Sequence, residues 1–220
     1  MMSVAPVASA GEAAGYYSNS DNYYFLGSLQ SLWMGEGAKA LGLEGNVRGD
    51  DLTAVLEGRL PDGSRLGKEV NGQHVHRPGH DLTFSAPKSV SILALIGNDK
   101  RMVEAHNHAV RVAAGYVEKL ISARDTKDGV TSIVHTGKMV AAAYTHDTSR
   151  NLDPQLHTHL LIANMPEYAG KWQALATDYI HNAGSIETVM KHQVTLGKLY
   201  RSALRERVEA LGHEVDDECM

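Results

Sequence analysis

The feature that most constrains this chain is a pair of histidines, His157 and His159, inside a mostly apolar run. Residues 155–164 read Gln-Leu-His-Thr-His-Leu-Leu-Ile-Ala-Asn, a pattern typical of a β-strand. In a strand, side chains two positions apart point to the same face, about 6.6 Å apart along the chain. The two imidazoles can therefore converge on one metal ion, each nitrogen reaching it at about 2.0–2.1 Å.

A third imidazole, that of His146, ends the preceding predicted strand at 138–146. If the two strands are antiparallel neighbours, His146 lies near the same end of the sheet as His157. Three histidines with open coordination positions are typical of a catalytic rather than a structural metal. Imidazole suits zinc, manganese, nickel and copper, so the ligands do not choose the ion. Taken alone, the histidine pair fits two satisfied polar residues equally well.

The chain holds a second histidine pair with the same spacing, His106 and His108. It falls in a predicted long helix over 99–124, where residues two apart point in different directions. We therefore expect these two side chains at the surface and not on a shared metal.

Secondary-structure signals predict an α+β fold. Paired strands with helices grouped between and after them indicate an antiparallel sheet with helices on one face, leaving the other face for a ligand. Strands are predicted at 2–8, 80–85, 130–136, 138–146 and 156–164. Helices are predicted within 9–32, in a short segment ending at Gly58, and at 85–96, 99–124 and 183–211, with an exposed loop at 59–79.

Bulk properties describe a globular chain of 220 residues that we expect to form one domain over 1–220. No apolar run is long enough to span a membrane, so we expect no membrane insertion. The single cysteine, Cys219, fits a reducing cytoplasmic compartment. A net charge of −5 weakly disfavours nucleic-acid binding, although basic clusters leave this open. The acidic end at 216–218 suggests a fragment of a longer protein.

Two tyrosine pairs lie seven residues apart near the start of the chain, Tyr16-Tyr17 and Tyr23-Tyr24. On a helix this spacing stacks one pair over the other, and by itself it favours core packing. A phenol has a pKa of about 10 and needs help to act as a nucleophile. A metal-bound phosphate and a carboxylate base could supply that help.

A carboxylate for such a role is Asp81, on the predicted strand face opposite Leu82 and Phe84. It could ligate the metal, orient a ligand histidine, or accept a proton. The alternative is an aspartate at a loop end that caps a neighbouring amide.

Together these motifs resemble the conjugative relaxases of the F-plasmid type, within the His-hydrophobe-His endonucleases. The resemblance extends over nearly the whole chain, and Thr158, which is not strongly hydrophobic, is its one departure. It rests on the tyrosine pairs with Asn22, on 57–63 (Glu-Gly-Arg-Leu-Pro-Asp-Gly), on 76–91, and on 146–150 leading to 154–159.

The resemblance implies a palm-like, five-stranded antiparallel sheet with flanking helices. It implies nicking of one DNA strand at a plasmid origin of transfer, with a 5′-phosphotyrosine link to the enzyme. It assigns one divalent ion, Mg²⁺ or Mn²⁺ first and Zn²⁺ or another transition metal otherwise. The implied roles are a metal site of His146, His157 and His159, Asp81 as orienting group and proton acceptor, Tyr16 as nucleophile, and Tyr17, Tyr23 and Tyr24 as the remaining family tyrosines.

Partners follow from the same resemblance: single-stranded origin DNA, accessory relaxosome proteins and a type IV secretion coupling protein, with transfer into the recipient cell also open. A DNA clamp and a helicase would belong to a longer parent protein. Single-strand recognition uses basic grooves and stacking. Candidate DNA contacts, each of which could instead be solvated surface, are Arg150 first, then Lys88, Lys191, Gln193, Lys198 and Arg201.

Two other functions remain open at this point. One is a metal-dependent hydrolytic nuclease with the tyrosines in the core. The other is a non-catalytic DNA-binding module related to rolling-circle replication initiators. A nucleotide-binding enzyme is disfavoured, because Ala40 replaces the last glycine of the pattern that begins at Gly35 and no Gly-Lys-Ser/Thr follows.

Overall fold

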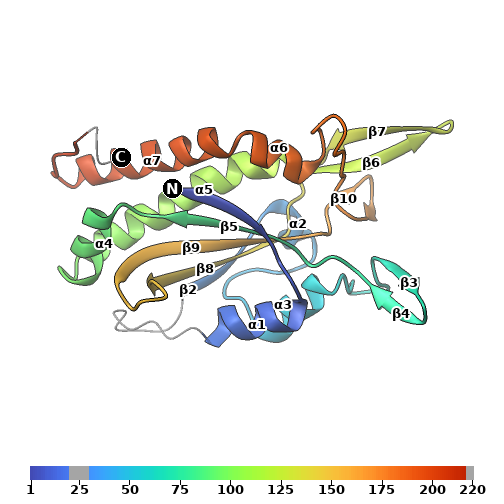
Figure 1. Ribbon diagram of the computed structural model, residues 1–220, viewed down its shortest axis with the longest axis horizontal. Helices are drawn as coiled ribbons and strands as arrows, with labels where there is room; N and C mark the ends of the chain where they lie inside the picture. Colours follow the sequence, from blue (N-terminus) through green and yellow to red (C-terminus); the bar gives the residue numbers. More distant parts are fainter. Residues whose placement is uncertain (20–29, 217–220) are drawn as a thin grey trace.

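A five-stranded antiparallel sheet forms the centre of the computed structural model, which describes residues 1–19 and 30–216 (Figure 1). The strand order is β1-β5-β9-β8-β2, so the two strands with the predicted ligands, β8 and β9, are neighbours near the middle. The predicted α+β class and five-stranded sheet are confirmed. In sheet order, the strands are β1 (Met2–Pro6), β5 (Gly79–Ser85), β9 (Pro154–Ala163), β8 (Ala141–Thr148) and β2 (Gln30–Met34).

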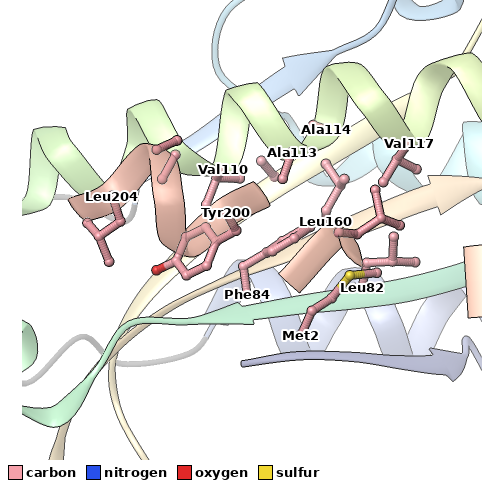
Figure 2. Close-up of a cluster of buried hydrophobic side chains, with 14 of the residues drawn as sticks. Met2, Leu82, Phe84, Val110, Ala113, Ala114, Val117, Leu160, Tyr200 and Leu204 are labelled. Atoms are coloured by element: carbon pink, nitrogen blue, oxygen red, sulfur yellow. The ribbon is translucent and has the colours of Figure 1, made fainter. Parts of the chain in front are cut away.

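Four helices cover one face of this sheet. The longest, α5, begins after Asp99, whose side chain accepts a hydrogen bond from the backbone N–H of Arg101 at 3.1 Å. Figure 2 shows the core between the helices and the strands, where Leu82, Phe84 and Leu160 meet α5 and α7. The four helices are α4 (Lys88–Leu95), α5 (Lys100–Leu120), α6 (Ser185–Lys191) and α7 (Gln193–Ala210).

The opposite face is partly covered, whereas the sequence predicted a free face. Helices α1 (Ala10–Asn19) and α3 (Gly49–Leu56) lie on it, on the side of the sheet away from α5 and α7 (Figure 1). Their apolar residues form a second core with β2, β8 and β9. Because α1 crosses this face, it brings residues from near the amino end to the middle of the sheet.

Two elements near this face differ from the prediction. Residues 30–34 form edge strand β2, which pairs with β8, whereas residues up to Leu32 were expected to belong to a helical segment. Pairing with a neighbouring strand outweighs local preference here. The short helix α2 (Glu36–Ala40) follows directly and was not predicted.

Among residues 1–19 and 30–216, three hairpins lie outside the central sheet. The turn of each contains a glycine and a preceding residue that both have positive φ. The pairs Asn71-Gly72 and Asp128-Gly129 are strong sequence signals for two-residue hairpin turns. The predicted loop at 59–79 therefore contains a hairpin, and the predicted helix 99–124 ends earlier, at Leu120. The hairpins are β3 (Lys68–Val70) with β4 (Gln73–Val75), β6 (Ser122–Lys127) with β7 (Val130–His135), and β10 (Glu167–Tyr168) with β11 (Lys171–Trp172).

The predicted helix over 183–211 is two helices, because the chain breaks at His192 between α6 and α7. Within the described residues, no helix has the length and apolar character needed to cross a membrane.

Candidate active site and metal centre

The three predicted metal ligands come together on the face of the sheet that carries α1. His146 on β8 pairs directly with His157 on β9, and His159 lies two residues further along the same face. Each histidine offers a ring nitrogen, and these nitrogens all lie within 4.8 Å of one another. Three imidazoles gathered this closely can hold one metal ion with positions left for a substrate.

Hydrogen bonds orient two of the three rings. The Nδ1 atom of His159 lies 2.7 Å from Asp81 Oδ2, and the Nδ1 atom of His157 lies 2.9 Å from the carbonyl oxygen of Gln155. A carboxylate and a carbonyl only accept hydrogen bonds, so both Nδ1 atoms carry the proton. The Nε2 lone pairs of both rings are therefore available to a metal.

Burial keeps two of the three imidazoles, those of His146 and His157, in the neutral form that can bind a metal. It is the main reason why the pKa of His146 falls to about 3, with a further contribution from positive charge on His159 and His157. Burial also lowers the pKa of His157. Neutral imidazole is the ligating form, so near neutral pH these two side chains need not lose a proton to bind an ion.

One tyrosine reaches this centre from α1. The hydroxyl of Tyr17 donates a hydrogen bond to Asp81 Oδ2 at 2.7 Å, and its ring centroid lies 5.0 Å from that of His159. Only 9% of Tyr17 is exposed. Asp81 thus connects a phenol to one of the three candidate metal-binding histidines. Tyr16 is the preceding residue of α1, and its side chain, like Tyr23 and Tyr24, lies outside the described part of the structure.

Comparison with known proteins identifies the family. A family model described as TrwC relaxase matches residues 10–219. The chain belongs to the TrwC relaxase family. The "Multifunctional conjugation protein TraI" of Escherichia coli strain K12 is 51% identical over 216 residues, which are 98% of this chain and 12% of that protein. A second TraI from Escherichia coli is 50% identical with the same coverage. The chain therefore spans about an eighth of the length of these relatives.

Solved structures of relaxases share the fold. A metal-bound structure of the conjugative relaxase TrwC in complex with oriT DNA has a TM-score of 0.84 and 34% identity, covering 100% of this chain and 74% of that one. A copper-bound TrwC complex with oriT DNA matches with the same score, identity and coverage. The resemblance to conjugative relaxases stated from the sequence is confirmed.

The predicted DNA contacts of this relaxase do not form one cluster. Arg150 is exposed in the turn between β8 and β9, whereas Lys191, Gln193, Lys198 and Arg201 belong to α6 and α7. Some of them already have protein partners. The Lys88 ammonium donates to the carbonyl of Pro154 at 3.0 Å. The Gln193 amide donates to the carbonyl of Met2 at 2.8 Å.

A large cleft of 1290 Å³ lies beside β1 and α6, at the level of His80 and Asn164 and away from the histidine triad. Its walls carry basic side chains, among them Lys68, Arg77, Arg124 and the predicted contact Lys191, together with Tyr179. Sequence reasoning missed the two arginines and Tyr179, because they come from segments far apart in the chain. Basic side chains beside an exposed aromatic ring are typical of surfaces that bind single-stranded nucleic acid, whose backbone is negatively charged and whose bases can stack on the ring.

One histidine was placed wrongly from the sequence. His106, expected at the surface, is completely buried, whereas His108 is partly exposed. On α5, His106 is four residues after Met102 and four before Val110, which are both buried. This spacing places it on the apolar stripe of the helix, a signal that the sequence did contain.

Proposed function

We propose that this relaxase domain nicks and rejoins one strand of DNA at a plasmid origin of transfer through a covalent 5′-phosphotyrosine. The observation that carries the proposal is the Tyr17–Asp81–His159 connection, which brings a phenol, a carboxylate and a proposed metal ligand into hydrogen-bond contact at one site. The relatives support it, since one is named as a conjugation protein and another was solved with oriT DNA. Family membership alone would not explain why these three side chains touch.

The chemistry of the donors fits a metal. His146, His157 and His159 would hold one divalent ion, the last two through Nε2. Such an ion would polarise the non-bridging oxygens of the scissile phosphate and would stabilise the charge that develops in the transition state. Of the two ions favoured from the sequence, Mn²⁺ suits three imidazoles better than Mg²⁺, which prefers oxygen ligands.

Tyr16 is the proposed nucleophile, and Tyr17 is the proposed partner that holds Asp81 in place. Tyr17 is already engaged, with its hydroxyl on Asp81 and its ring packed among those of Tyr144 and His159. The phenolic oxygen of Tyr16 would bond to phosphorus while its proton passes to Asp81 and the P–O3′ bond breaks, and the 3′ oxygen would take up a proton from solvent. One phosphodiester replaces another, so the reaction can run backwards and reseal the strand.

A hydrolytic nuclease remains the second candidate, because Tyr17 belongs to the buried apolar cluster under α1 and α3. In that case water would attack the phosphate and the tyrosines would serve the core. The products distinguish the two functions: hydrolysis leaves no DNA on the protein, whereas transesterification leaves one strand attached.

The test is a labelling experiment. A single-stranded oligonucleotide with an origin-of-transfer sequence and a label 3′ to the nick is incubated with the protein and Mn²⁺, then separated on a denaturing gel. We expect labelled protein from the wild type and none from His157→Ala. Free labelled DNA without any adduct would support the hydrolytic nuclease, and binding without cleavage would support a DNA-binding module.

We also propose how the DNA and other partners are engaged. The single strand would contact Arg150 near the metal, with Lys88, Lys191, Gln193, Lys198 and Arg201 as further contacts. The basic cleft beside α6, which includes Lys191, would supply further contacts away from the histidine triad. Accessory relaxosome proteins and a type IV secretion coupling protein are the proposed protein partners, in the cytoplasm, and helicase activity would belong to a longer parent protein.

A further inference from the structure

A chain of buried polar side chains runs behind the metal site, on the helix-covered face of the sheet. The two ring nitrogens of His106 bond to the Tyr200 hydroxyl at 2.7 Å and to Thr158 Oγ1 at 2.8 Å. Thr158 Oγ1 bonds to Thr145 Oγ1 at 2.9 Å, and Thr145 in turn donates to Asn107 Oδ1 at 3.4 Å. His106 and Tyr200 are completely buried, and 1% of Thr158 is exposed.

The surrounding core makes this polar chain unusual. Leu156, Leu160 and Ile162 share the helix-facing side of β9 with Thr158, and all three are completely buried and apolar. Figure 2 shows Tyr200 among Phe84, Val110 and Leu204. Polar groups in such a place cost free energy unless their hydrogen bonds are made. The bonds are made only if β8, β9, α5 and α7 keep one mutual position.

The direction of the hydrogen bonds follows from the two ends. Asn107 Oδ1 can only accept, so Thr145 donates to it, Thr158 donates to Thr145, and His106 donates to Thr158 through Nε2. At the other end, the buried Tyr200 hydroxyl donates a hydrogen bond to Nδ1 of His106. Both ends require the same neutral tautomer, with the proton on Nε2.

This chain of hydrogen bonds reaches β8 and β9 at the positions next to the three histidines. Thr158 lies between His157 and His159, and Thr145 directly precedes His146. Thr145 and Thr158 are partners across β8 and β9, next to the pairs His146 with His157 and Tyr144 with His159. The side-chain bond between the threonines therefore ties together, from behind, the two strands that present the imidazoles in front.

We propose that His106, acting through Thr158, is a positioning residue for the metal centre. The Tyr200 hydroxyl orients the imidazole of His106, and the imidazole orients the hydroxyl of Thr158. The hydrogen bond between Thr158 and Thr145 then holds β9 in one position relative to β8. The three ligand nitrogens are therefore already positioned to bind one ion. This inference rests on the proposed metal site, and it explains why a threonine takes the position between the two histidines.

The test compares Mn²⁺ affinity by titration calorimetry with the melting temperature of the metal-free protein. Thr158→Val keeps the side-chain volume and removes the hydroxyl, and we expect about tenfold weaker metal binding, the lower end for residues that orient ligands. Thr158→Ser keeps the hydroxyl and should bind within about twofold of the wild type. Tyr200→Phe removes the donor at the far end and should weaken binding about threefold.

The matched control is Ile162→Val, on the same strand and the same buried face but away from the ligands. It should lower the melting temperature by about 2–4 °C and leave metal affinity within about twofold. Wild-type metal affinity in Thr158→Val and Tyr200→Phe would overturn the inference. So would an equal loss of affinity in Ile162→Val. If Thr158→Val does not fold, Tyr200→Phe decides alone. A wild-type protein that binds no metal would instead overturn the proposed function.

Discussion

The hydroxyl of Tyr17 donates to Oδ2 of Asp81 at 2.7 Å although the two residues are 64 positions apart in the chain. The same oxygen lies 2.7 Å from Nδ1 of His159. This oxygen therefore has two partners, one on helix α1 and one on strand β9. Any change at Asp81 should affect both the phenol and the imidazole.

Asp81→Asn should weaken metal binding by about 10–100-fold, the usual loss when a group that orients a ligand histidine is changed. The amide keeps the shape but offers less charge to the His159 N–H, and it can turn its NH₂ group toward the ring. Titration calorimetry with Mn²⁺ measures the change. Asp62→Asn, in the exposed loop after α3, is the matched control and should bind as the wild type does. Wild-type affinity in Asp81→Asn would contradict this role.

Removing the metal should stop adduct formation and lower stability together. With EDTA the wild type should give no labelled protein, and Mn²⁺ in excess should restore it. At about 100 times the dissociation constant, the ion should add about 2.7 kcal/mol to the free energy of unfolding. Thermal melting with and without Mn²⁺ checks this. His157→Ala should show almost no difference between the two conditions, and a full Mn²⁺ shift in that variant would place the ion elsewhere.

Single substitutions of Tyr16 and Tyr17 should distinguish the roles of these two residues of α1. Tyr16→Phe should lose the labelled adduct, because no phenol would then attack the phosphate. Tyr17→Phe should still form the adduct, but the rate of adduct formation should fall about tenfold or more, because Asp81 loses a hydrogen bond in a buried site. Peptide mapping of the wild-type adduct checks the assignment directly. If the link maps to Tyr17, the two roles are exchanged, and unchanged cleavage in the double variant would favour hydrolysis.

The sequence predicted the histidine cluster well because alternation in a strand is a local rule. His157, His159 and Asp81 take the faces expected from their positions, and His146 needed only the assumption that β8 and β9 are neighbours. Edge strand β2 was missed because it depends on pairing with β8, which no local pattern reports. Two other features could have been predicted from the sequence but were overlooked. They are the hairpin turn at Asp128-Gly129 and the position of His106 on the apolar face of α5. The cleft beside α6 could not be foreseen, since it joins distant segments.

The stability of the metal-free protein should fall with decreasing pH in a way that depends on His106. Burial is the main reason why the pKa of His106 falls to about 3, and charge on His157 and on the amino terminus lowers it too. In the unfolded chain the pKa is about 6.5, so between these values only the unfolded state binds the proton. The contribution is complete above pH 6.5 and is lost toward pH 3, by up to about 1.4 kcal/mol per pH unit.

His106→Gln isolates this effect, because glutamine does not titrate and its amide can still donate to Thr158. The variant should be less stable at pH 7.5, where it packs less well, but should lose less stability between pH 6.5 and 4.5. Urea unfolding in EDTA at several pH values measures both slopes. His146 and His157 also have lowered pKa values and are present in both proteins, so the difference in slope reports His106. Parallel stability curves would mean that the imidazole of His106 gains its proton at nearly the same pH folded and unfolded, contrary to its burial.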